Sequence, residues 1–127
     1  MNSAQIEKAV TALADKVDHG LIVLPGPVNN TLRASIIQLA ARHHLPSIYP
    51  FKYYGQDGGL LCYGIDQVDE WSKAAGYVDR ILRGEKPADL PVQAPIKYDF
   101  IINLKTAKAL GIALPQSLLN RADEAIE

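Results

Sequence analysis

The chain has 127 residues, a formal net charge of -1, and the hydrophobic (48%) and charged (21%) fractions of an ordinary globular protein. This length suits one domain with a real core, and the near-neutral charge gives no basic footprint for nucleic acid and no cluster for an anionic membrane. A single cysteine, Cys62, excludes an intramolecular disulfide and a multi-cysteine metal site. No apolar run reaches the length of a membrane span, and these residues hold no secretory signal.

The first half of the chain alternates helical and strand patterns. Apolar residues at helical spacing predict a helix over residues 3–17, with Ser3 as its N-cap. Residues 20–24 form a short run that predicts a strand apolar on both faces, and residues 29–31 supply capping side chains at the start of the next helix. Residues 45–50 predict the following strand. This order is that of a right-handed βαβ unit.

The second half continues the alternation with a long interruption. Residues 60–63 predict a strand, and Asp66 caps a helix that ends before Gly84. A strand at 98–103, a helix at 104–110 and a last helical stretch at 116–126 complete the pattern. The apolar positions of the helix that Asp66 caps are expected to face a core, and they are Val68, Trp71, Ala75, Val78, Ile81 and Leu82.

A tether over residues 84–97 stands between that helix and the strand at 98–103. It carries Pro87, Pro91 and Pro95, and proline holds itself and the residue before it extended, so the tether cannot fold up locally and must travel. The chain also opens on a helix with no strand before it, as if it started in mid-fold. We therefore expect one α/β domain over residues 1–127, with a mainly parallel sheet flanked by helices and a crossing tether.

Catalytic chemistry has little support in the sequence. The serines lack a nucleophile elbow, and the glycines form neither a Walker loop nor a dinucleotide fingerprint. Cys62 lies in a predicted strand and is interpreted as a small core residue. His43 and His44 end a helix, where a cation suits the helix dipole, and His19 precedes a strand. We predict no enzyme activity, no cofactor and no metal site.

Binding is the stronger interpretation, because polar and aromatic residues follow the predicted strands. Ligands of open α/β sheets lie beyond the carboxyl ends of the strands, and free N–H groups at a helix start favour a carboxylate. Aromatic rings there could stack on a flat solute, with Tyr54 among them. The alternative is that the asparagines only cap helices and the rings only cover the sheet rim. The candidate ligand-binding residues are Asn29, Asn30, Thr31, Phe51, Tyr53 and Tyr63.

Several segments resemble one family. Residues 58–127 are similar to the carboxyl-terminal portion of the ABC transporter substrate-binding proteins of the tryptophan/phenylalanine-binding type, and "LAARHHLPSIYPF" at 39–51 is similar to the segment before it. The most specific matches are "AGYVDRIL" at 75–82, "GEKPADLP" at 84–91 and "NLKTA" at 103–107. The family commonly has serine where Cys62 stands and proline where Ile65 stands, and residues 52–57 are individual to this sequence.

The resemblance implies a type I periplasmic-binding fold, in which two α/β lobes hold a ligand between them and strands cross from one to the other. On this basis the chain is expected to be a solute-binding component of an ABC importer that lacks the first lobe, with the 84–97 tether crossing between lobes. The implied ligand is a small amino-acid-like solute, either an aromatic or another amino acid, and the implied partner is a transporter permease. The implied location is the periplasm.

Two other classes of function remain open in the sequence. One is a structural or interaction module that forms a homodimer through surface left bare, without ligand activity of its own. The other is an enzyme with a flavodoxin-like sheet, supported only by Cys62 and the three histidines.

Overall fold

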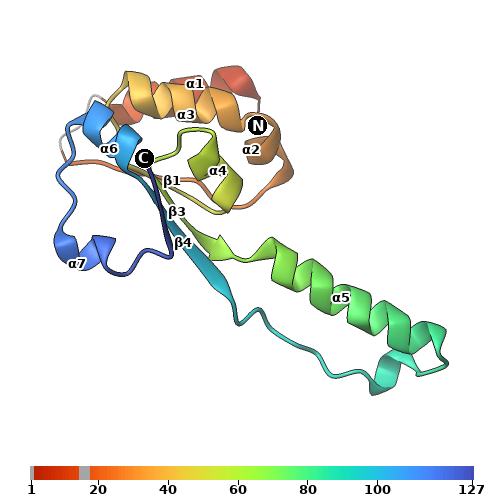
Figure 1. Cartoon of the computed structure of the whole chain (residues 1–127). Helices are drawn as coiled ribbons and strands as arrows, with labels where there is room; N and C mark the ends of the chain where they lie inside the picture. Colours follow the sequence, from red (N-terminus) through yellow and green to blue (C-terminus); the bar gives the residue numbers. More distant parts are fainter. Residues whose placement is uncertain (1, 15–17) are drawn as a thin grey trace. The chain divides into compact units, whose positions relative to one another are not determined.

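A computed structural model describes residues 2–14 and 18–127 of the protein (Figure 1). Helices and strands alternate along most of the chain. In chain order the elements are α1 (Ser3–Ala14), β1 (Leu21–Ile22), α2 (Pro27–Thr31), α3 (Arg33–Arg42), β2 (Ser47–Tyr49), α4 (Lys52–Gln56), β3 (Leu61–Ile65), α5 (Gln67–Leu82), the 3₁₀ turn η1 (Pro87–Asp89), β4 (Tyr98–Asn103), α6 (Leu104–Leu110), α7 (Gln116–Leu119) and β5 (Glu124–Ile126).

The strands form one sheet in the order β1-β2-β3-β4-β5. Strand β1 pairs with β2, β2 with β3, and β4 with β5 in parallel. Strand β4 runs against β3: the Asn103 N–H donates to the Leu60 carbonyl at 2.9 Å, and the Asp66 N–H donates to the Lys97 carbonyl at 3.0 Å. The sheet is mixed with parallel pairs in the majority, so the predicted α/β class with a mainly parallel sheet is confirmed.

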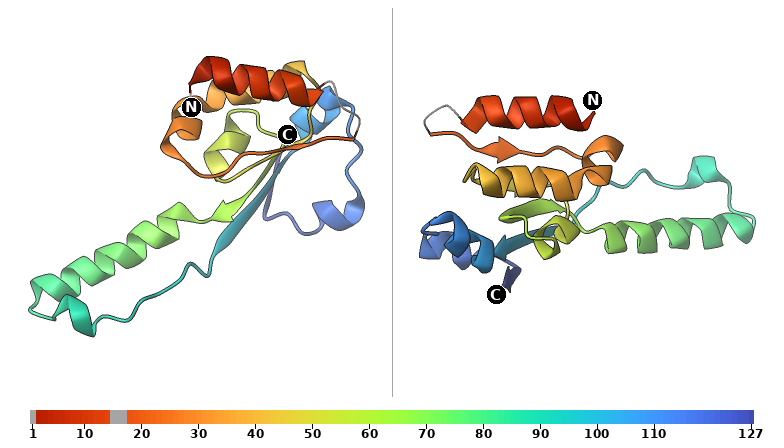
Figure 2. Two further views of the ribbon diagram at one scale, coloured as in Figure 1. Left: turned by 180° about the vertical axis from the view of Figure 1, so that it is seen from behind. Right: turned by 90° about the horizontal axis from the view of Figure 1, so that it is seen from above.

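The chain divides into two compact units. Unit 1 comprises residues 1–64 and 99–127, and unit 2 comprises residues 65–98. Unit 1 holds the core, where α1 and α3 lie side by side (Figure 2). The side chains that are most fully buried come from β2, α4, β3, the residue before β3, and β4, and they are Tyr49, Tyr54, Leu60, Cys62, Ile101 and Ile102. No residue of unit 2 is buried.

Caps set most of the helix boundaries where the sequence places them. The Asp66 carboxylate accepts from the N–H groups of Val68 and Asp69 at the start of α5, as predicted. Asn103 caps α6 in the same way, and Gly111 ends α6 in the left-handed region that favours glycine. The first helix differs from the prediction, because Asn2 and not Ser3 accepts from the N–H of Gln5. Its predicted extension over residues 15–17 lies outside the described residues.

Two predictions about strands are wrong. Strand β1 was expected to be covered on both faces, and one face is open within this chain. Val23, just beyond the strand, is buried, but Ile22 is 73% exposed. The reason is position, since β1 is the edge strand of this sheet. The final stretch is not one helix over 116–126, because α7 ends at Leu119 and β5 follows. The N–H of Asp123 donates to the Phe100 carbonyl at 2.8 Å, so pairing with β4 overrides the local helical pattern.

The expectation that α5 faces a core is also wrong within this chain. Its helical apolar pattern is present, but Trp71 is 74% exposed and Leu82 is 81% exposed. Periodicity predicts that a helix has an apolar face; it does not predict that the same chain covers that face.

Candidate functional site

The carboxyl ends of β1, β2 and β3 lie at one edge of the sheet because these strands are parallel. Helix α2 follows β1, and α4 follows β2 at this edge (Figure 1). The end of β3 approaches closely as well: a Cβ built on Gly64 would lie 1.8 Å from the carbonyl oxygen of Pro50. The segments after three strands therefore meet here, as the sequence predicted.

A ladder of four aromatic rings runs from the core to this edge. Tyr49 stacks on Tyr54 with ring centroids 5.1 Å apart, Tyr54 stacks on Tyr53 at 5.2 Å, and Tyr53 stacks on Phe51 at 5.4 Å. Tyr49 and Tyr54 are almost completely buried, whereas Tyr53 and Phe51 are half-buried. The aromatic ladder (Tyr49, Tyr54, Tyr53 and Phe51) thus begins in the core and ends at the rim. Tyr54, which the sequence offered as a ring that could stack on a solute, is 0% exposed and is closed to one.

The ladder is tied to its surroundings at two points. The Tyr54 hydroxyl donates to the Asn30 Oδ1 atom at 2.9 Å, which joins α4 to α2. The Arg33 guanidinium lies 5.1 Å from the centre of the Tyr53 ring, and Arg33 forms an ion pair with Asp57. The hydrogen bond to Asp57 raises the pKa of Arg33, and burial raises the pKa of Tyr53. The sequence analysis did not single out Arg33. The available indication was its place at the start of a predicted helix, three residues after the pair Asn29–Asn30.

The three polar residues after β1 lie later in a helix than predicted. Helix α2 begins at Pro27 and ends at Thr31, so Asn29 is its third residue, and Asn30 and Thr31 are its last two. The Asn30 N–H is already bonded to the Gly26 carbonyl at 2.9 Å. Proline suits the first position of a helix, so α2 starts at Pro27, before the predicted start at residues 29–31. The expectation of a free N–H group is therefore wrong for Asn30.

Their side chains make local bonds of different kinds. The Asn29 Nδ2 atom donates to the Leu24 carbonyl at 2.9 Å, and the Thr31 hydroxyl donates to the Pro27 carbonyl at 2.9 Å. These bonds fix the turn after β1 and match the capping alternative. Asn30 alone among the three bonds to the ladder.

Tyr63 lies on β3, next to Gly64 in the chain, and its printed ring contact is with Phe100 of β4. Its exposed ring meets the Phe100 ring edge-on, with centroids 6.2 Å apart. The structure therefore brings Asn30, Phe51 and Tyr53 into one connected cluster and places Tyr63 on the neighbouring strand of the same edge.

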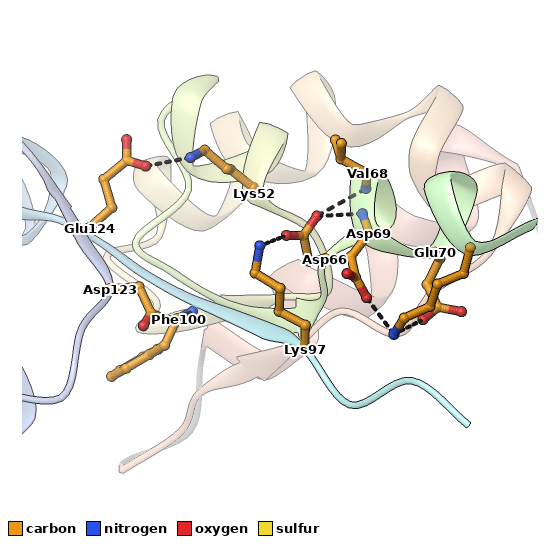
Figure 3. Close-up of polar contacts among 10 residues, drawn as sticks. Lys52, Asp66, Val68, Asp69, Glu70, Lys97, Phe100, Asp123 and Glu124 are labelled. Atoms are coloured by element: carbon orange, nitrogen blue, oxygen red, sulfur yellow. Dashed lines mark hydrogen bonds and ion pairs between the residues drawn. The ribbon is translucent and has the colours of Figure 1, made fainter. Parts of the chain in front are cut away.

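Ion pairs hold the elements next to this edge in place (Figure 3). Lys52, at the start of α4, pairs with Glu124 of β5. The Phe100 N–H donates to the Asp123 carboxylate at 2.7 Å. These contacts link the segment that carries Phe51 to the carboxyl-terminal strand.

The cysteine thiol and the possible metal ligands show no sign of chemical activity. Cys62 is 1% exposed, and burial raises the pKa of its thiol to about 12, so the thiol stays protonated at neutral pH. Among residues 2–14 and 18–127, no cluster of histidine, cysteine or carboxylate side chains could hold a metal ion. No helix in this described part of the chain has the length and apolar character needed to cross a membrane.

An apolar hollow of about 280 Å³ lies apart from the ladder, beside the exposed edge of β1. Side chains of α1, β1 and α3 line most of it, and Asn29 is its polar member.

The chain is similar to several known proteins that are longer than itself. A "Tyrosine-binding protein" of Clostridioides difficile (strain R20291) is 30% identical over 113 residues, which are 87% of this chain and 32% of that protein. A conserved domain protein from Vibrio cholerae is 29% identical with a TM-score of 0.86, covering 98% of this chain and 42% of that one. An ABC domain from Streptococcus pneumoniae in complex with L-Trp is 27% identical with a TM-score of 0.83, covering 98% and 43%.

The chain thus spans about a third of the length of this curated relative and less than half of these solved chains. The family model of the ABC transporter substrate binding proteins matches residues 1–126. This family consists of substrate-binding proteins and is not a class of enzymes, in agreement with the prediction. Since the match extends over nearly every residue, the chain belongs to the ABC transporter substrate binding protein family.

Proposed function

We propose that this chain is the carboxyl-terminal part of a solute-binding component of an ABC importer and that it binds a small amino-acid-like solute at the carboxyl edge of β1–β3. The observation that carries the proposal is the meeting of three strand ends around Asn30, Phe51 and Tyr53. Tyr63 adds an exposed ring on the third strand, and Asn29 and Thr31 hold the turn after the first.

The relatives support an amino-acid solute. One carries the name of a tyrosine-binding protein, and a solved neighbour is a complex with L-Trp. Aromatic solutes suit the ring-rich edge of this chain, because aromatic pairs gain free energy beyond the area that they bury. A permease partner and a periplasmic location follow from the importer role.

Unit 2 supports a two-lobed arrangement. An α-helix and a proline-bearing tether without any buried residue gain little stability by packing within themselves. In this proposal, residues 84–97 cross between lobes, and the apolar face of α5 packs in the other lobe. Closure of a second lobe supplies much of the ligand burial, so the 127-residue chain alone should bind solute weakly.

The test is an NMR titration of the ¹⁵N-labelled chain with L-tryptophan, L-tyrosine and L-phenylalanine. We expect saturable shifts at the amides of Asn30 and Phe51 with millimolar dissociation constants. Substitution of Asn30 by alanine should weaken the response, and Asn120→Ala, on the distant end of α7, should leave it unchanged. Shifts spread evenly over the surface, or no shifts with any of these solutes, would contradict the proposed site.

A second candidate function is self-association, favoured by one feature of α5. Its exposed apolar residues follow the alternating three- and four-residue spacing of a helix-pairing seam, and they are Val68, Trp71, Ala75, Val78 and Leu82. The first turn of α5 is acidic and its end is basic, with Asp69 and Glu70 at one end and Arg80 and Arg83 at the other. These charges are already paired along the helix, with Lys73 on Asp69 and Arg83 on Asp79, so the apolar seam by itself supports this candidate.

Sedimentation velocity at micromolar concentration distinguishes this candidate. A dimer that Trp71→Ser disrupts would support it, while Val92→Ser, a fully exposed apolar position outside the helix, should change nothing. A monomer at every concentration would leave the two-lobed arrangement as the explanation for the bare face of α5.

A further inference from the structure

The last part of the tether, residues 90–97, has the residue pattern of a strand although it is not part of the sheet. It contains no helix, and its trace is extended from η1 to the start of β4 (Figure 1). Leu90 has extended backbone angles, and Pro91 and Pro95 hold themselves and the residues before them extended. Every second residue is apolar, as in a strand with one apolar face: Leu90, Val92, Ala94, Ile96 and Tyr98.

The backbone groups of this segment point alternately to its two edges, as in any extended chain. The Pro91 carbonyl accepts from the Tyr77 hydroxyl of α5, and the Lys97 carbonyl accepts from the N–H of Asp66, the cap of α5. Both acceptors are odd-numbered residues. The odd residues therefore direct their backbone groups to the side of α5, and the even residues direct theirs to the opposite side.

The edge formed by the N–H and C=O groups of Val92, Ala94 and Ile96, here called the even edge, is open. Within residues 2–14 and 18–127, these three N–H groups have no hydrogen-bond partner. The side chains of Val92 and Ile96 are exposed as well. An open strand edge that carries apolar side chains is a template on which another strand can pair.

The even edge is complementary to itself. In an antiparallel pair centred on Ala94, Val92 of one copy lies opposite Ile96 of a second copy, and the two Ala94 residues lie opposite each other. Each residue on the even edge can then exchange both of its backbone bonds with the residue opposite. Contacts between β-branched side chains suit such a pair, and residues 90–96 carry no charge that would oppose it.

We propose that residues 90–96 pair through the even edge with the same residues of a second copy of this chain, in antiparallel orientation. The odd edge limits the assembly to two copies, because Pro91 and Pro95 have no N–H group to offer a third strand. A two-stranded ribbon is only marginally stable, so we expect the dimer to form at high micromolar concentration. This inference goes beyond solute binding, and the surface is distinct from the apolar seam of α5.

Proline substitutions at neighbouring positions give a matched test by sedimentation velocity of the full 127-residue chain, from low micromolar to millimolar concentration. Ala94→Pro removes the central N–H group of the even edge, whereas Gln93→Pro makes the same chemical change on the odd edge. We expect Ala94→Pro to weaken the dimer roughly tenfold or more, because two hydrogen bonds are lost, and Gln93→Pro to leave it unchanged. Equal effects of the two substitutions, or a monomer at every concentration, would overturn the inference.

Hydrogen exchange of the natural chain gives a second readout of the same geometry. Dimer formation should protect the amides of Val92, Ala94 and Ile96 and leave the Gln93 amide between them exchanging freely. Equal protection of Gln93 would contradict pairing through one edge. A peptide of residues 89–98 that protects the three amides while the chain itself stays monomeric would show that the edge accepts a strand from another partner, and would overturn the second copy as its occupant.

Two further substitutions separate this dimer from the other proposals. Val92→Ser should weaken it roughly two- to tenfold through the lost cross-strand contacts, and Trp71→Ser should leave it unchanged. This result is the reverse of the one expected for pairing through α5, so a dimer that only Trp71→Ser disrupts would exclude the even edge. The solute titration at the Asn30 amide tests the proposed function separately, and either proposal can fail without the other.

Discussion

Single atoms decide how closely the strand ends meet. Gly64 of β3 lies so near the Pro50 carbonyl that the space for a Cβ is already occupied. Gly59 is similar, with the Tyr49 ring and the Tyr54 carbonyl 2.8 Å from its Cβ position. Both glycines are needed because other atoms already occupy the place of a Cβ, and those atoms belong to two ladder residues at Gly59 and to Pro50 at Gly64. Gly76 on α5 is the opposite case, with nothing within 4 Å.

Gly64→Ala should destabilise the protein by about 3 kcal/mol or more, at the upper end of the cost of overpacking, because the obstacle is backbone. Gly76→Ala is the matched control, and it should stabilise by about 0.5–1 kcal/mol because alanine suits a helix interior. Urea unfolding measures both. Equal effects of the two substitutions would mean that the Pro50–Gly64 approach is not tight.

The buried thiol and phenol predict a loss of stability at high pH. Burial raises the pKa of both Cys62 and Tyr54 to about 12, from ordinary values of 9.0 and 10.0. Between pH 9 and 12 the unfolded state loses these protons and the folded state keeps them, so stability falls as pH rises. Cys62→Ala should flatten this decline from pH 9 upward. Unfolding curves of the two proteins that stay parallel across that range would contradict the prediction.

At the scale of elements, α5 shows how a helix can be well specified and still lack a partner. Asp66 caps it, the Lys73 ammonium lies 2.6 Å from the Asp69 carboxylate one turn away, and Arg83 pairs with Asp79 near its end. These are local interactions that a sequence encodes within one helix. Burial of the apolar face requires something else, and in the described residues that face is open to solvent.

The start of α5 should respond to acid. The hydrogen bond from Lys97 is the main reason that the pKa of Asp66 lies below its ordinary value, and the N–H groups of Asp69 and Val68 add to it. A depressed pKa means that the stabilisation is present above the ordinary carboxyl range and is lost as pH falls through the lowered value. The protection factors of the Val68 and Asp69 amides, which correct for the slower intrinsic exchange in acid, should therefore fall on acidification. Asp66→Asn keeps an acceptor but cannot titrate, and a variant as acid-sensitive as the natural chain would exclude this mechanism.

At the scale of the whole molecule, the two units differ in what holds them together. Unit 1 has a sheet, covering helices and a continuous buried cluster that includes Ile36, Tyr49 and Ile101. Unit 2 has caps, surface ion pairs and the bond from the Tyr77 hydroxyl to the Pro91 carbonyl, but no buried side chain. Exposed ion pairs contribute little, so the free energy of opening should be much lower in unit 2.

Hydrogen exchange should show this difference directly. At low concentration the amides of β2, β3 and α3 should be protected far longer than those of α5. Protection of α5 that rises with protein concentration would indicate a second copy on its apolar face. Strong protection of α5 at every concentration would contradict the assignment of unit 2 as a segment without its own core.

Local chemistry explains which predictions succeeded. The cap at Asp66 and the limits of β4 and α6 depend on residues near each other in the chain, and each was predicted. The last helix failed because β5 exists only by pairing with β4, more than twenty residues earlier. The predicted start of α2 was wrong by a few residues, because Pro27 opens the helix.

By itself, the sequence determined the α/β order, the mainly parallel sheet, the crossing tether as a hypothesis, and the edge at which polar and aromatic residues gather, because periodicity and capping act over one or two turns. Only the tertiary structure decided that Tyr54 is buried while Phe51 ends the ladder, that Arg33 joins it, and that α5 is left uncovered. Those outcomes depend on distances between residues far apart in the chain, and a pattern of residue types does not contain them.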